Sequence, residues 1–162
     1  MRRSAFLGVG GFHPVLFWPG EERIFSWDLA ASGWACCYVD AVVAHHQPSS
    51  SRPPSAWRRR VEMRNDLLTT WLRRPAGVVL GETFALARRA LRDRNAGAAL
   101  GAALRRLPAV VRHRRPLPLA TRQLARLVLE PVAKPDRLQQ LARTHGRIRH
   151  RCAVEQHRQH HV

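Results

Sequence analysis

The sequence predicts an α/β segment followed by a mainly helical, arginine-rich region, and three observations lead to this fold class. Residues 1–51 are rich in glycine and aromatic side chains and carry three arginines against four acidic residues. Residues 52–162 carry 25 of the 28 basic residues, with apolar residues at helical spacing. Between these segments, the prolines and serines of residues 48–54 favour neither helix nor strand and predict a linker.

A few short strands and one helix are expected in the first segment. The short stretch at 2–7 predicts a strand that ends at the glycines of residues 8–11. Residues 21–32 predict a helix, because two acidic residues favour its first turn and Phe25 and Leu29 lie four residues apart. Gly33 suits the left-handed residue that ends such a helix. The valines of residues 34–44 predict one or two further strands.

Helices are expected throughout the second segment, at 52–131. Apolar residues from Trp57 to Trp71 predict a helix that stops at Pro75. A second stripe follows, formed by Leu80, Phe84, Ala87 and Leu91. Residues 95–97 are expected to separate it from a helix over 98–107, which stops at a proline, and another helix is expected over 119–129. The histidine- and arginine-rich tail at 132–162 is expected to be poorly ordered.

The composition excludes several classes of protein. No apolar run reaches the roughly 20 residues of a membrane-spanning helix, and no cleavable signal peptide is expected. Three cysteines, two of them adjacent, cannot form a disulfide framework, so a cytoplasmic location is expected. Arginine supplies 27 of the 28 basic residues, which fits a GC-rich coding sequence and weakens the +17 formal charge as a functional signal. Collagen, coiled coil, disulfide scaffold and membrane channel are excluded.

Several short motifs occur in a defined order. A Gly-Gly-Phe turn at 10–12 is followed by Gly-Glu-Glu at 20–22, by Ser-Gly-Trp at 32–34, by two histidines and by Arg-Asn at 64–65. Their order and spacing resemble the C-terminal half of the catalytic domain of the inverting family 2 glycosyltransferases, which have the GT-A fold. The resemblance covers about residues 2–74. It implies transfer of a sugar from a nucleotide-diphosphate sugar to a hydroxyl acceptor.

The resemblance also assigns roles to individual residues. It makes Glu22 the base that deprotonates the acceptor hydroxyl, with Glu21 as the second choice. The residues that it places against substrate are Gly10, Gly11, Phe12, Trp18 and Arg64. It implies a divalent metal, Mg²⁺ or Mn²⁺, with His45 and His46 as candidate ligands. The alternative interpretation of the residues alone is that the two glutamates serve the helix dipole and that the histidines and Arg64 are solvated.

The donor-binding half of such an enzyme is missing from this sequence. Only nine residues precede Gly10, and no Asp-x-Asp occurs anywhere. The chain taken alone is therefore expected to be inactive and to bind nucleotide sugar poorly.

A second hypothesis is a non-catalytic basic protein that binds nucleic acid or an anionic membrane surface. The basic second segment supports it. No helix-turn-helix, zinc finger or RNA-recognition signature is present, so no specific nucleic acid is expected. Peripheral contact with the cytoplasmic face of a membrane would place arginine-rich helices on anionic lipid, with Trp57 and Trp71 as interfacial anchors.

Overall fold

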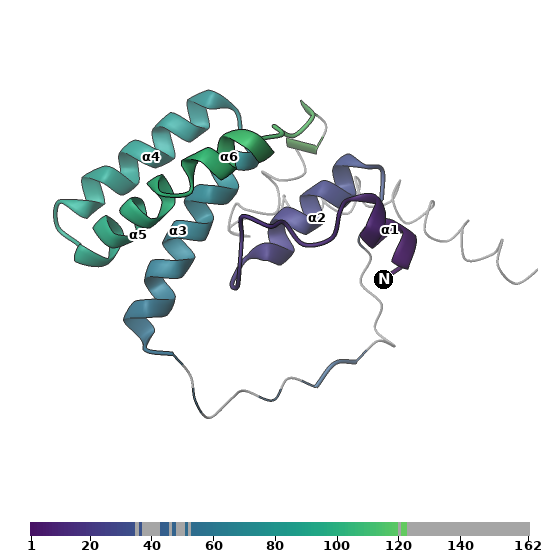
Figure 1. Ribbon diagram of the computed structural model, residues 1–162, viewed down its shortest axis with the longest axis horizontal. Coiled ribbons are helices and arrows are strands. Elements are labelled where there is room, and N and C mark those ends of the chain that lie inside the picture. The colour runs from purple at the N-terminus through teal and green to yellow at the C-terminus, as the bar shows by residue number, and fades with distance from the viewer. Residues whose placement is uncertain are drawn as a thin grey trace, which may run out of the picture.

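The structure of the protein is a computed structural model that describes residues 1–34, 36, 43–45, 47, 51, 53–119 and 121–122. Six helices are found there, and no strand occurs among these residues (Figure 1). The helices are α1 (Arg3–Gly8), α2 (Glu21–Ala31), α3 (Ser55–Arg73), α4 (Ala76–Ala90), α5 (Arg94–Leu104) and α6 (Leu107–His113). The prediction of an α/β fold is therefore wrong. Most of the strand region expected at 34–44 lies outside the described residues.

The strand expected at 2–7 is instead helix α1. The C-terminus of α1 favours a helix, because Gly10 and Gly11 after it complete a Schellman motif that satisfies its last carbonyls. Gly10 has a φ of +82°, its N–H donates to the carbonyl of Leu7, and the N–H of Gly11 donates to the carbonyl of Phe6 at 2.9 Å. A six-residue stretch is too short for period 2 to be distinguished from period 3.6.

Helix α2 confirms the helix expected over 21–32. Gly20 precedes it with a φ of +98°, and two glutamates occupy its first turn. At its end Gly33 has a φ of +84°, and the N–H of Trp34 donates to the carbonyl of Leu29 at 3.0 Å. This second Schellman motif confirms the expected role of Gly33.

Prolines set the limits of the next two helices. Helix α3 begins directly after Pro54, and it ends before Pro75, as the sequence predicts. The residue before Pro75, Arg74, is extended at φ −97° and ψ 159°, because a proline ring disfavours helical geometry in the preceding residue. Helix α4 then begins directly after Pro75.

The expected break at residues 95–97 is wrong, because those residues form the first turn of α5. The side chain of Asp93 accepts the N–H of Asn95 at 2.8 Å, which is an N-cap and fixes the start of the helix at Arg94. Pro108 lies in the first turn of α6, where a missing N–H costs nothing.

The main hydrophobic core joins the first and second segments of the chain. Residues Val15 and Leu16 of the loop after α1, and Ile24 of α2, pack into the same cluster as the centre of α3. The other buried members of this cluster are Leu67, Leu68, Trp71, Leu72, Ala103 and Val110. Trp71 is 5% exposed and its Nε1 donates to Thr83 Oγ1 at 2.8 Å, so it is not an interfacial anchor.

The chain returns to α3 after α6. The N–H of Arg115 donates to the carbonyl of Leu72 at 3.0 Å, and that of Leu117 donates to the carbonyl of Arg73 at 2.9 Å. Leu117 is buried against Trp27 of α2. The last carbonyls of α3 are thus satisfied by a segment more than 40 residues later in the chain.

Candidate functional site

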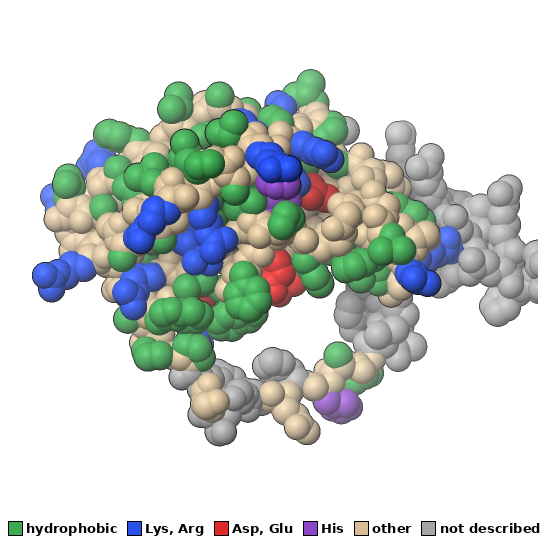
Figure 2. Space-filling model, in the orientation of Figure 1, with side chains coloured by type: hydrophobic (Ala, Val, Ile, Leu, Met, Phe, Trp, Pro, Cys, Tyr) green, Lys and Arg blue, Asp and Glu red, His purple; other side chains and the backbone are tan. Residues whose placement is uncertain are grey.

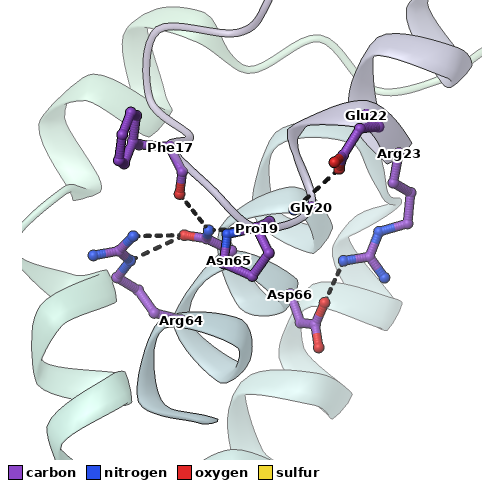
Figure 3. A network of polar contacts seen from close by, with 8 residues as sticks. All are labelled: Phe17, Pro19, Gly20, Glu22, Arg23, Arg64, Asn65 and Asp66. Atoms are coloured by element: carbon purple, nitrogen blue, oxygen red, sulfur yellow. Dashed lines mark hydrogen bonds and ion pairs between the residues drawn. The ribbon is translucent and has the colours of Figure 1, made fainter. Parts of the chain in front are cut away.

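A buried asparagine holds the loop that precedes α2 against α3. Asn65 is 1% exposed, and its Nδ2 donates to the carbonyls of Phe17 and Pro19 at 2.8 and 2.7 Å (Figure 3). Its Oδ1 accepts from Nε and Nη2 of Arg64 at 3.0 and 2.9 Å. Every polar atom of the Asn65 amide therefore has a partner, which fixes both the loop and the Arg64 guanidinium.

The same loop carries exposed aromatic rings. Trp18 stacks on Trp57 of α3, with ring centroids 6.2 Å apart and planes at 17°. The two rings remain 41% and 39% exposed, and Phe17 is 75% exposed. Aromatic side chains usually bury most of their surface, so three partly or largely exposed rings on one loop and the adjoining helix form an unusual exposed aromatic patch.

The two predicted catalytic glutamates lie at the start of α2. Oε2 of Glu22 accepts the N–H of Gly20 at 3.2 Å. Oε2 of Glu21 is buried and has no hydrogen-bond partner among the described residues. The next residue, Arg23, forms an ion pair with Asp66 of α3 (Figure 3). The local structure assigns Glu22 a role at the helix N-terminus, and its role as a base remains a prediction.

The structure separates the other predicted substrate residues. Trp18 and Arg64 lie near the loop before α2, whereas Gly10 and Gly11 form the end of α1. Phe12 lies in a ring cluster with Phe6 and Phe25, with centroid distances of 5.6 and 5.2 Å. The substrate-binding roles stay predictions.

The predicted metal ligands do not form a described site. His45 is exposed, and His46 lies outside the described residues. Within the described ranges, no group of three or more His, Cys, Asp or Glu side chains could hold a metal ion. The divalent metal remains a prediction.

A buried polar cluster behind the loop was not predicted from the sequence. Arg73 is 4% exposed and forms two hydrogen bonds with the carboxylate of Asp28, at 2.6 and 2.7 Å. The rings of His13 and His113 meet edge to face at 5.6 Å. Nη1 of Arg106 donates to the carbonyl of Val15 at 2.6 Å. Arg73 and Arg106 therefore have structural roles. The sequence signal that could have indicated burial of Arg73 is the helical spacing that places it on the apolar side of α3.

His13 makes the stability of the fold depend on pH. Burial, and then the charge of Arg73, lower the pKa of His13 from 6.5 to about 4, while Asp28 acts in the opposite direction and His113 and Arg115 lower it further. The unprotonated Nδ1 accepts the N–H of Val15 at 3.3 Å. Between these two pKa values, His13 is protonated in the unfolded state and neutral in the folded state. Its contribution to the free energy of unfolding is therefore fully present above pH 6.5 and is lost as the pH drops toward 4.

We expect the free energy of unfolding to fall by about 1–2 kcal/mol across this window, after allowance for solvent screening. Urea titrations followed by circular dichroism across that pH range measure it. A His13→Gln variant keeps a side-chain acceptor but does not titrate, so its stability should change less with pH. Equal pH dependence in the two proteins would contradict the assignment.

A cavity of about 240 Å³ lies between α3 and α4. Its charged lining residues are Asp66, Glu82 and Arg89. Asp66 pairs with Arg23, and Arg89 pairs with Asp93 at 3.2 Å. Two of the three charges are thus neutralised by neighbours within the fold.

The outer face of α4 is apolar and exposed. None of the 15 residues of α4 is buried. Leu80, Phe84 and Leu91 are 71%, 65% and 85% exposed. Figure 2 shows hydrophobic side chains along the outer edge of this helix, with basic side chains between them. The apolar stripe that the sequence predicts is present, and it faces away from the core.

Comparison with protein-family models, curated proteins and solved structures finds no match to this chain. The GT-A fold is built around a sheet, whereas the described residues are helical and contain no strand. The resemblance to the family 2 glycosyltransferases is therefore wrong. The separate expectation of sugar transfer has not been tested and stays a prediction. No helix in the described part of the chain combines the length and the apolarity needed to cross a membrane.

Proposed function

We propose that the protein binds an anionic membrane surface through the outer face of α4. The observation that carries this proposal is the exposure of Leu80 and Phe84 on one side of α4, which buries no residue, and of Leu91 directly after its end. A helix that lies at a membrane interface presents an apolar face to the acyl chains and basic side chains to the headgroups. The cytoplasmic location remains an expectation.

The contacts of α4 explain why this face is available. The helix rests on the core through Val79 and Leu86, which are partly buried. Thr83, on the same side, accepts the indole N–H of Trp71. The side that holds α4 in place is therefore distinct from the outer stripe. Insertion of the stripe into an interface does not require α4 to leave the core.

The charges next to the stripe fit an anionic surface. Arg88 follows Phe84 by one turn, and Arg92 and Arg94 lie exposed at the same end of the helix. Glu82, the one acidic residue of α4, lines the cavity toward α3. Each arginine close to an anionic leaflet contributes about 1 kcal/mol. The chain as a whole carries a formal charge of +17, which attracts the same surface.

Vesicle co-sedimentation tests the proposal. We expect binding to vesicles that contain phosphatidylglycerol and much weaker binding to pure phosphatidylcholine. Phe84→Ser should weaken binding by about tenfold or more, because an inserted aromatic side chain contributes roughly 1.5–3 kcal/mol. Arg88→Gln should weaken it about fivefold. Leu7→Ser is the matched control, since Leu7 is 60% exposed on α1, far along the chain from α4.

Two results would overturn the proposal. Equal losses of vesicle binding in Phe84→Ser and Leu7→Ser would show that any exposed apolar side chain contributes to binding and that α4 has no special role. Concentration-dependent self-association that Phe84→Ser abolishes, without vesicle binding, would assign the stripe to a second copy of the chain. Thermal unfolding of each variant confirms that its fold is intact.

A further inference from the structure

We infer that a second surface, formed by Phe17, Trp18 and Trp57 with Arg60 and Arg64, binds single-stranded nucleic acid. We call it the aromatic–arginine surface. It lies on α3 and on the loop before α2, so it shares no residue with the outer face of α4. It is therefore separate from the membrane contact proposed above.

The three rings supply faces on which bases can stack. Trp18 and Trp57 are parallel to within 17° and are both partly exposed, and Phe17 next to them is 75% exposed. Unpaired bases stack on such rings whatever their sequence. A duplex hides its base faces, so these rings favour a single strand.

The arginines lie on the same face of α3 as Trp57. Residues 57, 60 and 64 recur at i, i+3 and i+7, which places Trp57, Arg60 and Arg64 along one side of the helix. The acidic residues of α3, Glu62 and Asp66, fall on its other sides by the same spacing. Figure 2 shows basic side chains gathered over α3 and α5, next to a group of hydrophobic ones.

A second guanidinium lies close to Arg64. Burial and the charge of Arg106 lower the pKa of Arg64, so two like charges are held near one another. Both guanidinium groups donate to neutral acceptors, Arg64 to the Asn65 amide oxygen and Arg106 to the carbonyl of Val15. A phosphate between them would relieve the repulsion and accept charge-assisted hydrogen bonds.

The surface is also held in place before any ligand binds. The two hydrogen bonds from Asn65 Nδ2 fix the carbonyls of Phe17 and Pro19, on either side of Trp18 (Figure 3). The stacked ring of Trp57 fixes the ring of Trp18. Little conformational entropy is then lost on binding, which favours affinity.

Fluorescence anisotropy with a labelled oligo(dT) of about 12 nucleotides tests the inference, and a duplex of the same length is the comparison. We expect the single strand to bind more tightly than the duplex. Trp57→Ala should weaken binding about tenfold, and Trp57→Phe should restore most of it. Arg60→Gln should weaken binding about fivefold. It should also reduce the slope of log K against log salt concentration by about 0.7 in magnitude. Arg59→Gln removes the same charge from another side of α3 and should change binding little.

The outcomes that overturn the inference are distinct from those that overturn the membrane contact. Equal effects of Arg59→Gln and Arg60→Gln would reduce the binding to nonspecific charge attraction. Duplex binding as tight as that of oligo(dT), or full binding by Trp57→Ala, would remove the stacking role. Loss of phosphatidylglycerol vesicle binding in Trp57→Ala, without oligo(dT) binding in the wild type, would assign this surface to lipid. Phe84→Ser should retain oligo(dT) binding, and a loss there would also contradict two separate surfaces.

Discussion

An Arg73→Ala variant is expected to lose about 3–5 kcal/mol of its free energy of unfolding. Arg73 is 4% exposed, and its guanidinium forms two hydrogen bonds with the carboxylate of Asp28. Its Nη1 also donates to the carbonyls of Leu72 and His113 at 3.3 and 3.4 Å. Truncation would leave the partly buried carboxylate of Asp28 without its cation and would open a cavity among three helices.

Urea unfolding followed by circular dichroism measures this loss. Arg59→Ala is the matched control, because it removes an exposed arginine from the same helix and should change stability by less than about 0.5 kcal/mol. The double variant Arg73→Met with Asp28→Leu should regain most of the loss, since an apolar pair of similar size leaves no charge unpaired. A single variant within about 1 kcal/mol of the wild type would contradict a structural role for this ion pair.

Asn65→Ala should lower the free energy of unfolding by about 2–4 kcal/mol. The substitution removes both donors to the carbonyls of Phe17 and Pro19, and it removes the acceptor that orients Arg64. Because Asn65 is 1% exposed, water cannot replace these bonds without rearrangement of the loop.

The same unfolding titration, together with tryptophan fluorescence, reports on this variant. Asn65→Asp is the informative comparison. It keeps the side-chain size and an acceptor for Arg64, but a carboxylate cannot donate to the two carbonyls. We therefore expect Asn65→Asp to be destabilised as well. Wild-type stability in Asn65→Asp would show that the stabilisation by Asn65 comes from its bond to Arg64 and not from its bonds to the loop carbonyls.

Helices with strong local boundaries could be predicted from the sequence. Residues 21–31 and 55–73 were found because acidic first-turn residues, a following glycine and flanking prolines are signals contained within a few residues. The strand expected at 2–7 is wrong, since six residues carry too little periodicity to separate a strand from the helix found there. The turn at 95–97 was misplaced because the cap of Asp93 outweighs the low helix propensity of Asn95 and Gly97.

The candidate surfaces could be predicted only in part. The sequence pointed to Trp18, Trp57 and Arg64, and it contained the stripe of α4, but it did not indicate which sides stay exposed. The partners of Asn65 lie 46 and 48 residues away, and the partner of Arg73 lies 45 residues away. Contacts at such separation depend on tertiary packing and have no local signal. A motif-based resemblance could not detect them.

The return of residues 114–118 along α3 has a consequence for biosynthesis. The carbonyls of Leu72 and Arg73 are satisfied by the N–H groups of Arg115 and Leu117, and Leu117 is buried against Trp27. During vectorial synthesis these donors leave the ribosome after every helix described above. The end of α3 and one side of α2 therefore remain exposed to water until the ribosome has passed Leu117. Nascent chains arrested before that residue should be cleaved by protease near Arg73, and chains arrested well beyond it should be protected.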